Sequence, residues 1–234
     1  MRRDYGTVQS RRERPAKPAL TSAGIVAAAV SVMRSEGLER VTMRRLAEEL
    51  DTGPASLYVY FRNAAELRSA VLDELLVEVD LDPVTGEGDW RDRLHAVVDS
   101  YLAVLMKYPS LARSVLLTRP SPSGPRFMDL VEALLVLLHQ GGVDGQRAAW
   151  AVDLLLQVAT ATGVEQGTAA ENPGDERGWD ALADAVDRAD AIRYPRVRAL
   201  GAELLSGPGE ERFRWGLSVL INGILISPAP AGDV

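Results

Sequence analysis

Two groups of polar side chains have the types and the spacing to bind an anion. Thr42, Arg44 and Arg45 stand where a helix is expected to begin, and a helix N-terminus that carries a hydroxyl and two guanidinium groups favours anions. Tyr58 and Tyr60 follow in the next helical segment, and their hydroxyls can donate to phosphate oxygens. The pattern therefore predicts a phosphate-rich partner.

Residues that could support catalysis or hold a metal are poorly represented. The chain has no cysteine, which excludes disulfides, thiolate nucleophiles and thiolate metal sites and fits the reducing cytoplasm. His95 and His139 lie far apart and lack acidic partners at metal-binding spacing. Asp180, Asp184 and Asp187 recur at helical spacing, as on a solvated face. No glycine-rich phosphate loop is visible either, so we expect no enzyme, no cofactor and no metal.

Residues Thr42 to Phe61 predict two short helices joined by a tight turn. Thr42 is a suitable N-cap, and Val41 and Leu46 are placed to form a hydrophobic staple across it. The segment Asp51 to Pro54 interrupts the helix, and a proline in the first turn of the next helix removes no intrahelical hydrogen bond. The arrangement is a helix-turn-helix, in which the second helix places its N-terminal residues on base edges in the major groove.

The second of these helices has two different sides. Leu57 and Phe61, four residues apart, are expected to be buried, while Tyr58 and Tyr60 point outward. Its start carries small or polar residues, which permit a close approach to the bases. They are Thr52, Pro54, Ala55 and Ser56. The two tyrosines could also be half-buried helix aromatics, but their surroundings favour contact with DNA.

The charge of the chain is unevenly distributed. Residues 1–70 hold 12 Lys or Arg and 8 Asp or Glu, a balance of +4, whereas residues 71–234 hold 14 and 25, a balance of −11, which together give the net charge of −7. A basic end on an acidic body orients a protein on a polyanion. Residues 1–19 are themselves basic and proline-containing, and we expect a flexible arm that either touches DNA or aids solubility.

Nearly all of the chain beyond the arm has helical periodicity, and no strand alternation is visible. We expect a DNA-binding domain over residues 20–82, opened by a helix from Thr21 to Gly37, and an effector-binding and dimerisation domain over residues 83–234. Loops are expected at 120–125 and 168–177. The helices expected in the second domain are 90–107, 110–117, 126–140, 146–166, weaker pieces to 205, and 210–226. The predicted fold is all-α.

The helix-turn-helix resembles the DNA-binding head of TetR-family repressors. The resemblance rests on Thr42-Met43-Arg44-Arg45-Leu46-Ala47-Glu48-Glu49-Leu50 and Ser56-Leu57-Tyr58-Val59-Tyr60-Phe61, and it covers residues 20–76. It implies an all-helical homodimer whose third helix enters the major groove of a palindromic operator. It also implies a small-molecule effector, which binds the C-terminal domain, changes the spacing of the two heads and releases the DNA.

Two positions depart from the family pattern. Asp51 stands where a glycine is usual in the turn, and aspartate tolerates the left-handed backbone better than most residues. Ala64 stands where many members have a phosphate-contacting lysine, so that contact is lost. The predicted DNA-binding residues are Thr42, Arg44, Arg45, Thr52, Pro54, Ala55, Ser56, Tyr58, Tyr60 and Asn63.

The C-terminal part is similar to the tetracycline-repressor branch of the family. The similarity rests on Trp90-Arg91-Asp92-Arg93-Leu94, on Leu117-Thr118-Arg119-Pro120 and on the helix end at Glu132 to Gly141. Val115 occupies the position of the histidine that helps that branch bind magnesium-tetracycline, so we do not expect that ligand. Residues that could line an effector pocket, or equally pack in the core, are Tyr101, Met106, Thr118, Arg119, Phe127, Trp150 and Gln157.

Two helices carry more apolar surface than a small domain hides, and they are the candidates for dimerisation. They are 146–166, with Trp150, Leu154 and Val158, and 213–226, with Trp215, Leu217, Leu220, Ile221 and Ile224. A membrane span is not expected, because the apolar run 133–138 is far too short. No apolar segment typical of a secretory signal follows Met1-Arg2-Arg3.

Two other classes of protein remain open at this point. One is an all-helical enzyme or ligand-binding protein in which the N-terminal helices only complete the fold. The other is a scaffold that recruits partners through its acidic helices, insensitive to DNA and small molecules. The poor catalytic inventory argues against the enzyme, and DNA binding separates all three classes.

Overall fold

The computed structural model describes residues 19–118, 124–171 and 176–228. Within these ranges the chain forms helices and turns, without a strand, and the predicted all-α class is confirmed. Arg119 and almost all of the predicted arm at 1–19 lie outside the described residues.

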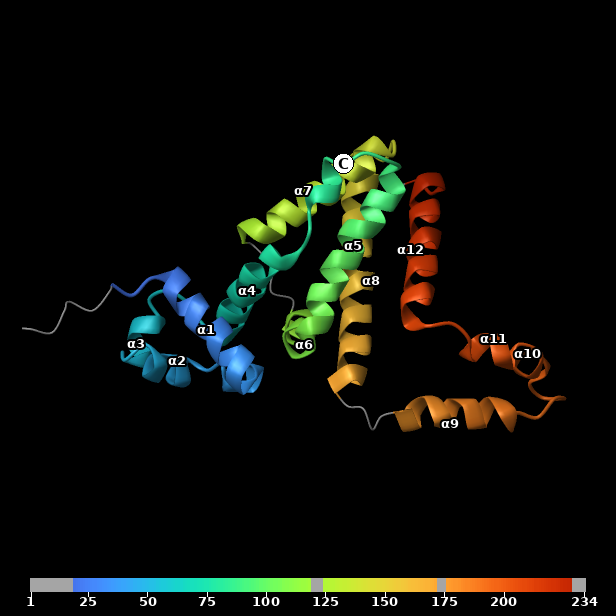
Figure 1. The fold of residues 1–234 in the computed structure, drawn as a ribbon, viewed down its shortest axis with the longest axis horizontal. Helices are drawn as coiled ribbons and strands as arrows, with labels where there is room; N and C mark the ends of the chain where they lie inside the picture. The colour runs from blue at the N-terminus through green and yellow to red at the C-terminus, as the bar shows by residue number, and fades with distance from the viewer. Residues whose placement is uncertain (1–18, 119–123, 172–175, 229–234) are drawn as a thin grey trace, which may run out of the picture.

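The N-terminal unit is a cluster of helices (Figure 1), and its buried apolar side chains belong to a core cluster that continues into the larger unit. Its centre is formed by side chains without solvent exposure, among them Ile25, Leu46 and Leu57. Each of these comes from a different helix, so burial holds the unit together. The elements are α1 (Ser22–Glu36), the 3-10 turn η1 (Leu38–Arg40), α2 (Met43–Glu49), α3 (Pro54–Leu57) and α4 (Ala64–Leu75).

Two turns in this unit need unusual backbone angles. Gly37 ends α1 with φ of 90°, a conformation that is cheap for glycine. Asp51, between α2 and α3, has φ of 48°, so the left-handed turn survives without a glycine, as predicted. The second helix of the helix-turn-helix is α3. It is shorter than expected, because it ends at Leu57 and the tyrosines stand in the turn that follows.

Helix α4 joins the N-terminal unit to the rest of the molecule. It packs against α6 and α7 and continues into the 3-10 turn η2 (Leu76–Glu78). Asp73 on α4 accepts a hydrogen bond of 2.9 Å from the backbone N–H of Phe127, in the first turn of α7, where a carboxylate is favourable. Helix α4 is therefore joined to α6 and α7 by packed contacts and to α7 by this hydrogen bond.

The larger unit is built on the long helices α5 and α8, which lie side by side (Figure 1). Leu94, Leu105, Leu134 and Leu155 are essentially fully buried between α5, α7 and α8, and α12 runs back along α8 and α5. The elements are η3 (Asp82–Val84), α5 (Trp90–Lys107), α6 (Pro109–Thr118), α7 (Pro125–Gln140), α8 (Gly145–Glu171) and α12 (Gly209–Ile226).

Between α8 and α12 the chain makes an extension that leads away from the body (Figure 1). It comprises α9 (Glu176–Asp187), α10 (Pro195–Ala199) and α11 (Gly201–Leu205). The predicted loop at 168–177 was wrong at both of its ends, because α8 continues to Glu171 and α9 begins at Glu176. No helix among the described residues is long and apolar enough to cross a membrane.

Candidate nucleic-acid interface and effector groove

The N-terminus of α2 is held in place by its own cap. Thr42 has extended backbone angles, and its hydroxyl oxygen accepts a hydrogen bond of 3.1 Å from the backbone N–H of Arg45. Val41 and Leu46, the predicted staple, are both buried. The first turn of α2 is therefore rigid, and the side chains that it carries have fixed starting points.

The two arginines in this turn have different surroundings. Arg44 is exposed, and its only described ion pair is with Glu48 on the same helix, at 3.3 Å. Arg45 is half-buried and forms ion pairs with Glu36, at the end of α1, and with Glu49. These two carboxylates raise the pKa of Arg45, and the hydrogen bond with Arg45 lowers the pKa of Glu36. Arg44 thus holds an exposed guanidinium at the start of α2, while Arg45 fastens α1 to α2.

Helix α3 presents a small and largely polar surface. Pro54 and Ala55 are exposed and Thr52 and Ser56 are half-buried, while Leu57 has no solvent exposure. The backbone N–H of Thr52 donates to the carbonyl of Ala47 at 2.8 Å, which ties the turn to α2. The start of α3 is thus fixed in direction and free of bulky groups.

The two tyrosines after α3 also differ. Neither ring is buried: Tyr58 is 53% exposed and Tyr60 is 39% exposed, while Phe61 beside them is in the core. The hydroxyl of Tyr60 donates a hydrogen bond of 2.6 Å to the carbonyl of Leu20, just before α1. The donor of Tyr60 is therefore engaged within the chain, and Tyr58 is the more accessible of the two.

Asn63 begins the next helix. Its side-chain oxygen accepts a hydrogen bond of 2.8 Å from the backbone N–H of Glu66, and the carboxylate of Glu66 accepts one of 2.7 Å from the backbone N–H of Arg62. This reciprocal arrangement caps α4. Asn63 is exposed, but its side-chain oxygen serves the helix cap.

The residues predicted to line an effector pocket are scattered. Tyr101 is buried and shares a 3.0 Å hydrogen bond with Thr160, Phe127 is half-buried, and Trp150 and Gln157 are exposed on α8. Met106 is 37% exposed. Thr118 ends α6, and Arg119 lies outside the described residues. The structure does not bring the described members of this set into one cavity.

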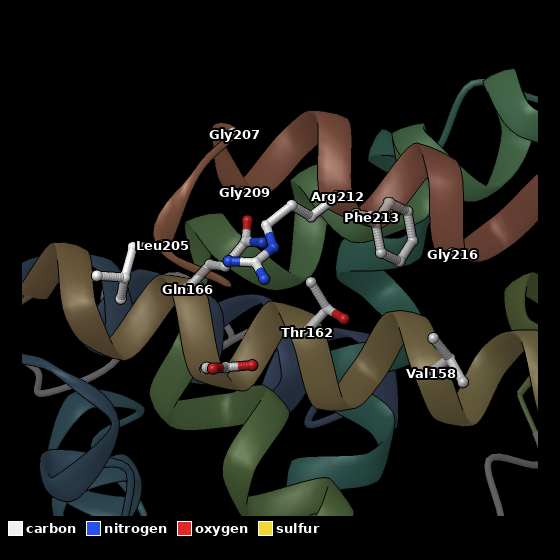
Figure 2. A pocket seen from close by; sticks show the side chains of 10 residues that line it. Val158, Thr162, Gln166, Leu205, Gly207, Gly209, Arg212, Phe213 and Gly216 are labelled. Atoms are coloured by element: carbon white, nitrogen blue, oxygen red, sulfur yellow. The ribbon is translucent and has the colours of Figure 1, made fainter. Parts of the chain in front are cut away.

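A different hollow lies between the second half of α8 and the first half of α12. It has a volume of about 720 Å³, within the range of small-molecule sites. Figure 2 shows Thr162 and Gln166 on α8 facing Arg212 and Phe213 on α12, with Leu205 at one end. The guanidinium of Arg212 donates to the carbonyl of Leu204 at 3.2 Å. We call this hollow the α8/α12 groove.

The predictions missed the α8/α12 groove because its walls are distant in sequence. Gln166 and Arg212 meet only because the chain returns along α8 after the extension. A local clue exists at Gly207 and Gly209. Gly207 has φ of 82°, and a Cβ on Gly209 would lie 2.9 Å from the side-chain amide nitrogen of Gln166. Two glycines around a proline indicate a close approach, but not which helix is approached.

The faces of α8 and α12 that look away from the core carry large apolar side chains. Trp150 and Leu154 on α8 and Trp215 and Val219 on α12 are all exposed, with Trp215 at 71%. Leu217, Ile221 and Ile224, predicted on the same dimerisation surface, are instead buried against the body. The apolar positions of α12 are therefore divided between the core and solvent.

Comparison with known proteins agrees with both units. Residues 25–71 match the family of bacterial regulatory proteins of the tetR type, and residues 82–227 match the tetracyclin repressor-like C-terminal domain. The chain belongs to the TetR family. Members are transcriptional repressors that bind operator DNA as dimers and are released by small ligands, and this chain is a regulator of that kind.

Similar proteins extend over most of the chain. The transcriptional repressor DrrR1 of Streptomyces coeruleorubidus is 32% identical over 220 residues, covering 92% of this chain and 80% of the relative. The transcription regulator SCO7704 of Streptomyces is 50% identical, with a TM-score of 0.76, covering 93% of this chain and 100% of the solved one. ActR of Streptomyces coelicolor, solved with actinorhodin, is 32% identical with a TM-score of 0.78, covering 92% and 99%. These relatives are transcription regulators rather than enzymes.

Proposed function

We propose that residues 20–82 bind an operator by placing the start of α3 in the major groove, while residues 83–234 bind the effector and dimerise. Thr52, Pro54, Ala55 and Ser56 would face base edges. The observation that supports this most is the exposed ring of Tyr58 beside a rigid, unobstructed α3. Because its targets are genes, the protein is expected to act in the cytoplasm.

The other predicted DNA-binding residues divide by their partners. Arg44 and Tyr58 stand at the surface and are proposed to contact phosphates flanking the site. Thr42 is also exposed, and although its hydroxyl oxygen caps α2, its O–H is proposed to donate to a phosphate. The guanidinium of Arg45, the hydroxyl of Tyr60 and the side-chain oxygen of Asn63 are each engaged within the unit. We expect these three to act mainly by holding α1, α2 and α4 in place.

Dimerisation is proposed to use the exposed apolar faces of α8 and α12. Trp150, Leu154, Trp215 and Val219 give these faces the large apolar groups that obligate interfaces bury. Pairing them by two-fold symmetry forms a four-helix contact between the protomers. The two α3 helices would then stand about 34–36 Å apart, one turn of the duplex.

The effector is proposed to be a flat, oxygen-bearing, multi-ring organic molecule bound in the α8/α12 groove. Phe213, Val158 and Leu205 offer apolar contacts, while Thr162, Gln166 and Arg212 offer hydrogen-bond partners for ring oxygens. ActR is solved with actinorhodin, and several relatives are tetracycline repressors, such as the class C protein of Escherichia coli at 27% identity. Val115 makes the magnesium chelate of tetracycline a poor candidate, so actinorhodin is the better probe.

DNA binding is tested by fluorescence anisotropy with the chain's own upstream DNA and with an unrelated duplex. We expect tight binding to an inverted repeat that weakens steeply with salt, because Lys and Arg release counterions from phosphates. Equal affinity for the unrelated duplex would contradict specific repression. An enzyme or a scaffold would bind neither duplex.

The groove is tested by adding actinorhodin to the protein bound to its operator. Binding should raise the melting temperature and release the DNA. Arg212→Ala should lower the affinity for actinorhodin about tenfold, since it removes a polar anchor of the ligand. Both the rise in melting temperature and the release of DNA should then require more actinorhodin. Arg214→Ala is the matched control, because Arg214 lies two residues away and pairs with Asp99 at 3.0 Å outside the groove. Equal effects of the two substitutions would contradict an effector site in the α8/α12 groove.

A further inference from the structure

Four side chains close a polar ring where the N-terminal unit meets the end of α5. The carboxylate of Glu78, in η2, receives the ammonium of Lys107 at 2.6 Å, the guanidinium of Arg34 at 2.9 Å and the hydroxyl of Tyr108 at 3.0 Å. Arg34, on α1, also donates to the hydroxyl oxygen of Tyr108 at 3.2 Å. Lys107 and Tyr108 keep the pKa of Glu78 below its ordinary value. We call these four residues the Glu78 ring.

The Glu78 ring lies at the surface beside the apolar contact of α1 with α4, where Met33 and Leu75 are buried. A hollow of about 510 Å³ lies on one side, between the end of α1 and the start of α6. A second hollow, of about 680 Å³, lies between α1 and the end of α4. The ring therefore adds a polar link between α1 and the end of α5 to the apolar packing of α1 on α4, and closely packed side chains resist a change of angle.

The same corner is in close contact with the helix that forms the α8/α12 groove. Two glycines of α8, next to the groove residues Thr162 and Gln166, leave no room for a side chain. A Cβ on Gly163 would lie 2.8 Å from the Cβ of Leu105, and one on Gly167 would lie 2.6 Å from the Cβ of Pro109. Pro109 directly follows Tyr108. A shift of α8 thus pushes on the segment that carries Lys107 and Tyr108.

We propose that the Glu78 ring sets the angle of the DNA-binding head against the body and transmits movements of α8 to the head. Its residues are positioning residues: they touch neither DNA nor effector, and they hold the head through Arg34. The transmission part rests on the proposed effector site in the α8/α12 groove. The angle-setting part depends only on the contacts described here.

The test measures the distance between the two heads of the dimer by double electron–electron resonance. The chain has no cysteine, so a single Glu39→Cys substitution at an exposed position of η1 accepts a spin label on each head. In Glu78→Gln we expect a broader distance distribution and operator binding weakened about tenfold, a typical size for coupling between sites. Arg34→Gln should do the same, and the double variant should be no worse than either single one.

The matched control is Glu74→Gln, which removes the same charge from an exposed position one turn earlier on α4. It should leave the distance distribution and the operator affinity unchanged. A Glu78→Gln variant that behaves like this control would overturn the proposal. So would a lowered melting temperature with an unchanged distance distribution, because that result indicates a stabilising ion pair only.

Transmission is tested with Gly167→Ala, whose added methyl must displace α8 from Pro109. We expect this variant to shift the distance between the heads without any effector, and to cause no further shift in the Glu78→Gln background. An equal shift in both backgrounds would show that movement reaches the head by another route. The distances are measured without DNA, so they stand even if wild-type protein fails to bind its operator and the proposed function falls.

Discussion

The head and the body of this protein expose different chemistry. The head offers a short helix with small polar residues, flanked by Arg44 and Tyr58, and the first 70 residues carry a charge balance of +4. The body carries −11 and exposes large apolar side chains, such as Trp150 and Trp215, along α8 and α12. The contrast indicates one surface for a polyanion and another for a second copy of the chain, and each can be disrupted separately.

The largest effect is expected at the apolar surface of the body. Trp215→Asp places a charge where two protomers are proposed to bury an aromatic ring, and desolvating an unpaired charge is costly. We expect monomers in sedimentation analysis and operator affinity reduced more than 100-fold, because one head alone makes half of the contacts. The control is Ile192→Asp, at another exposed apolar position. Dimers that persist in Trp215→Asp would place the interface elsewhere.

A smaller effect distinguishes the two arginines of α2. Arg44→Ala should weaken operator binding about five- to tenfold and reduce the salt dependence by roughly one phosphate contact, with an unchanged melting temperature. Arg45→Ala should lower the melting temperature by a few degrees, because it breaks the ion pairs to Glu36 and Glu49. Anisotropy titrations at several salt concentrations and thermal melts measure both. If Arg45→Ala instead reduced the salt dependence at an unchanged melting temperature, Arg45 would contact DNA directly.

The smallest effect concerns acid stability and the Glu78 ring. In the folded chain the pKa of Glu78 is lowered, first by Lys107 and then by Tyr108, from an ordinary value of 4.5. Its stabilising contribution is therefore fully present above pH 4.5 and is lost as the pH falls through the lower, folded pKa. Urea unfolding of wild type and Glu78→Gln should differ by a constant amount above about pH 5 and converge below it. A difference that grows in acid would contradict this contact.

Features formed by residues close together in the sequence could be predicted, whereas features formed by residues distant in the sequence could not. Thr42, Asp51 and Leu57 lie within one motif, so their cap, left-handed turn and burial follow from local rules. The α8/α12 groove brings Gln166 to Arg212 only through the path of the chain after α8, and no local pattern reveals that path. Periodicity also could not assign α12, because apolar residues occur on both its buried and its exposed sides.

The partners of polar side chains were the other limit. Arg44 and Arg45 are adjacent and of one residue type, and Tyr58 and Tyr60 are of one type and almost adjacent. Only their tertiary contacts distinguish the two members of each pair. Glu36 reaches Arg45 from the end of α1, and the carbonyl of Leu20 reaches Tyr60 from before it. A sequence shows which groups can bind a phosphate. It does not show which of them are already engaged within the fold.

The most direct test of the account compares the two tyrosines in operator binding. We measure the affinity of Tyr58→Ala and Tyr60→Phe for the inverted repeat upstream of the gene, by fluorescence anisotropy at fixed salt, with melting temperatures alongside. The account predicts about tenfold weaker binding for Tyr58→Ala at unchanged stability. It predicts a smaller loss of affinity for Tyr60→Phe, caused by the loss of the hydrogen bond to the carbonyl of Leu20. Wild-type affinity in Tyr58→Ala would contradict the claim that this face of the head lies on DNA.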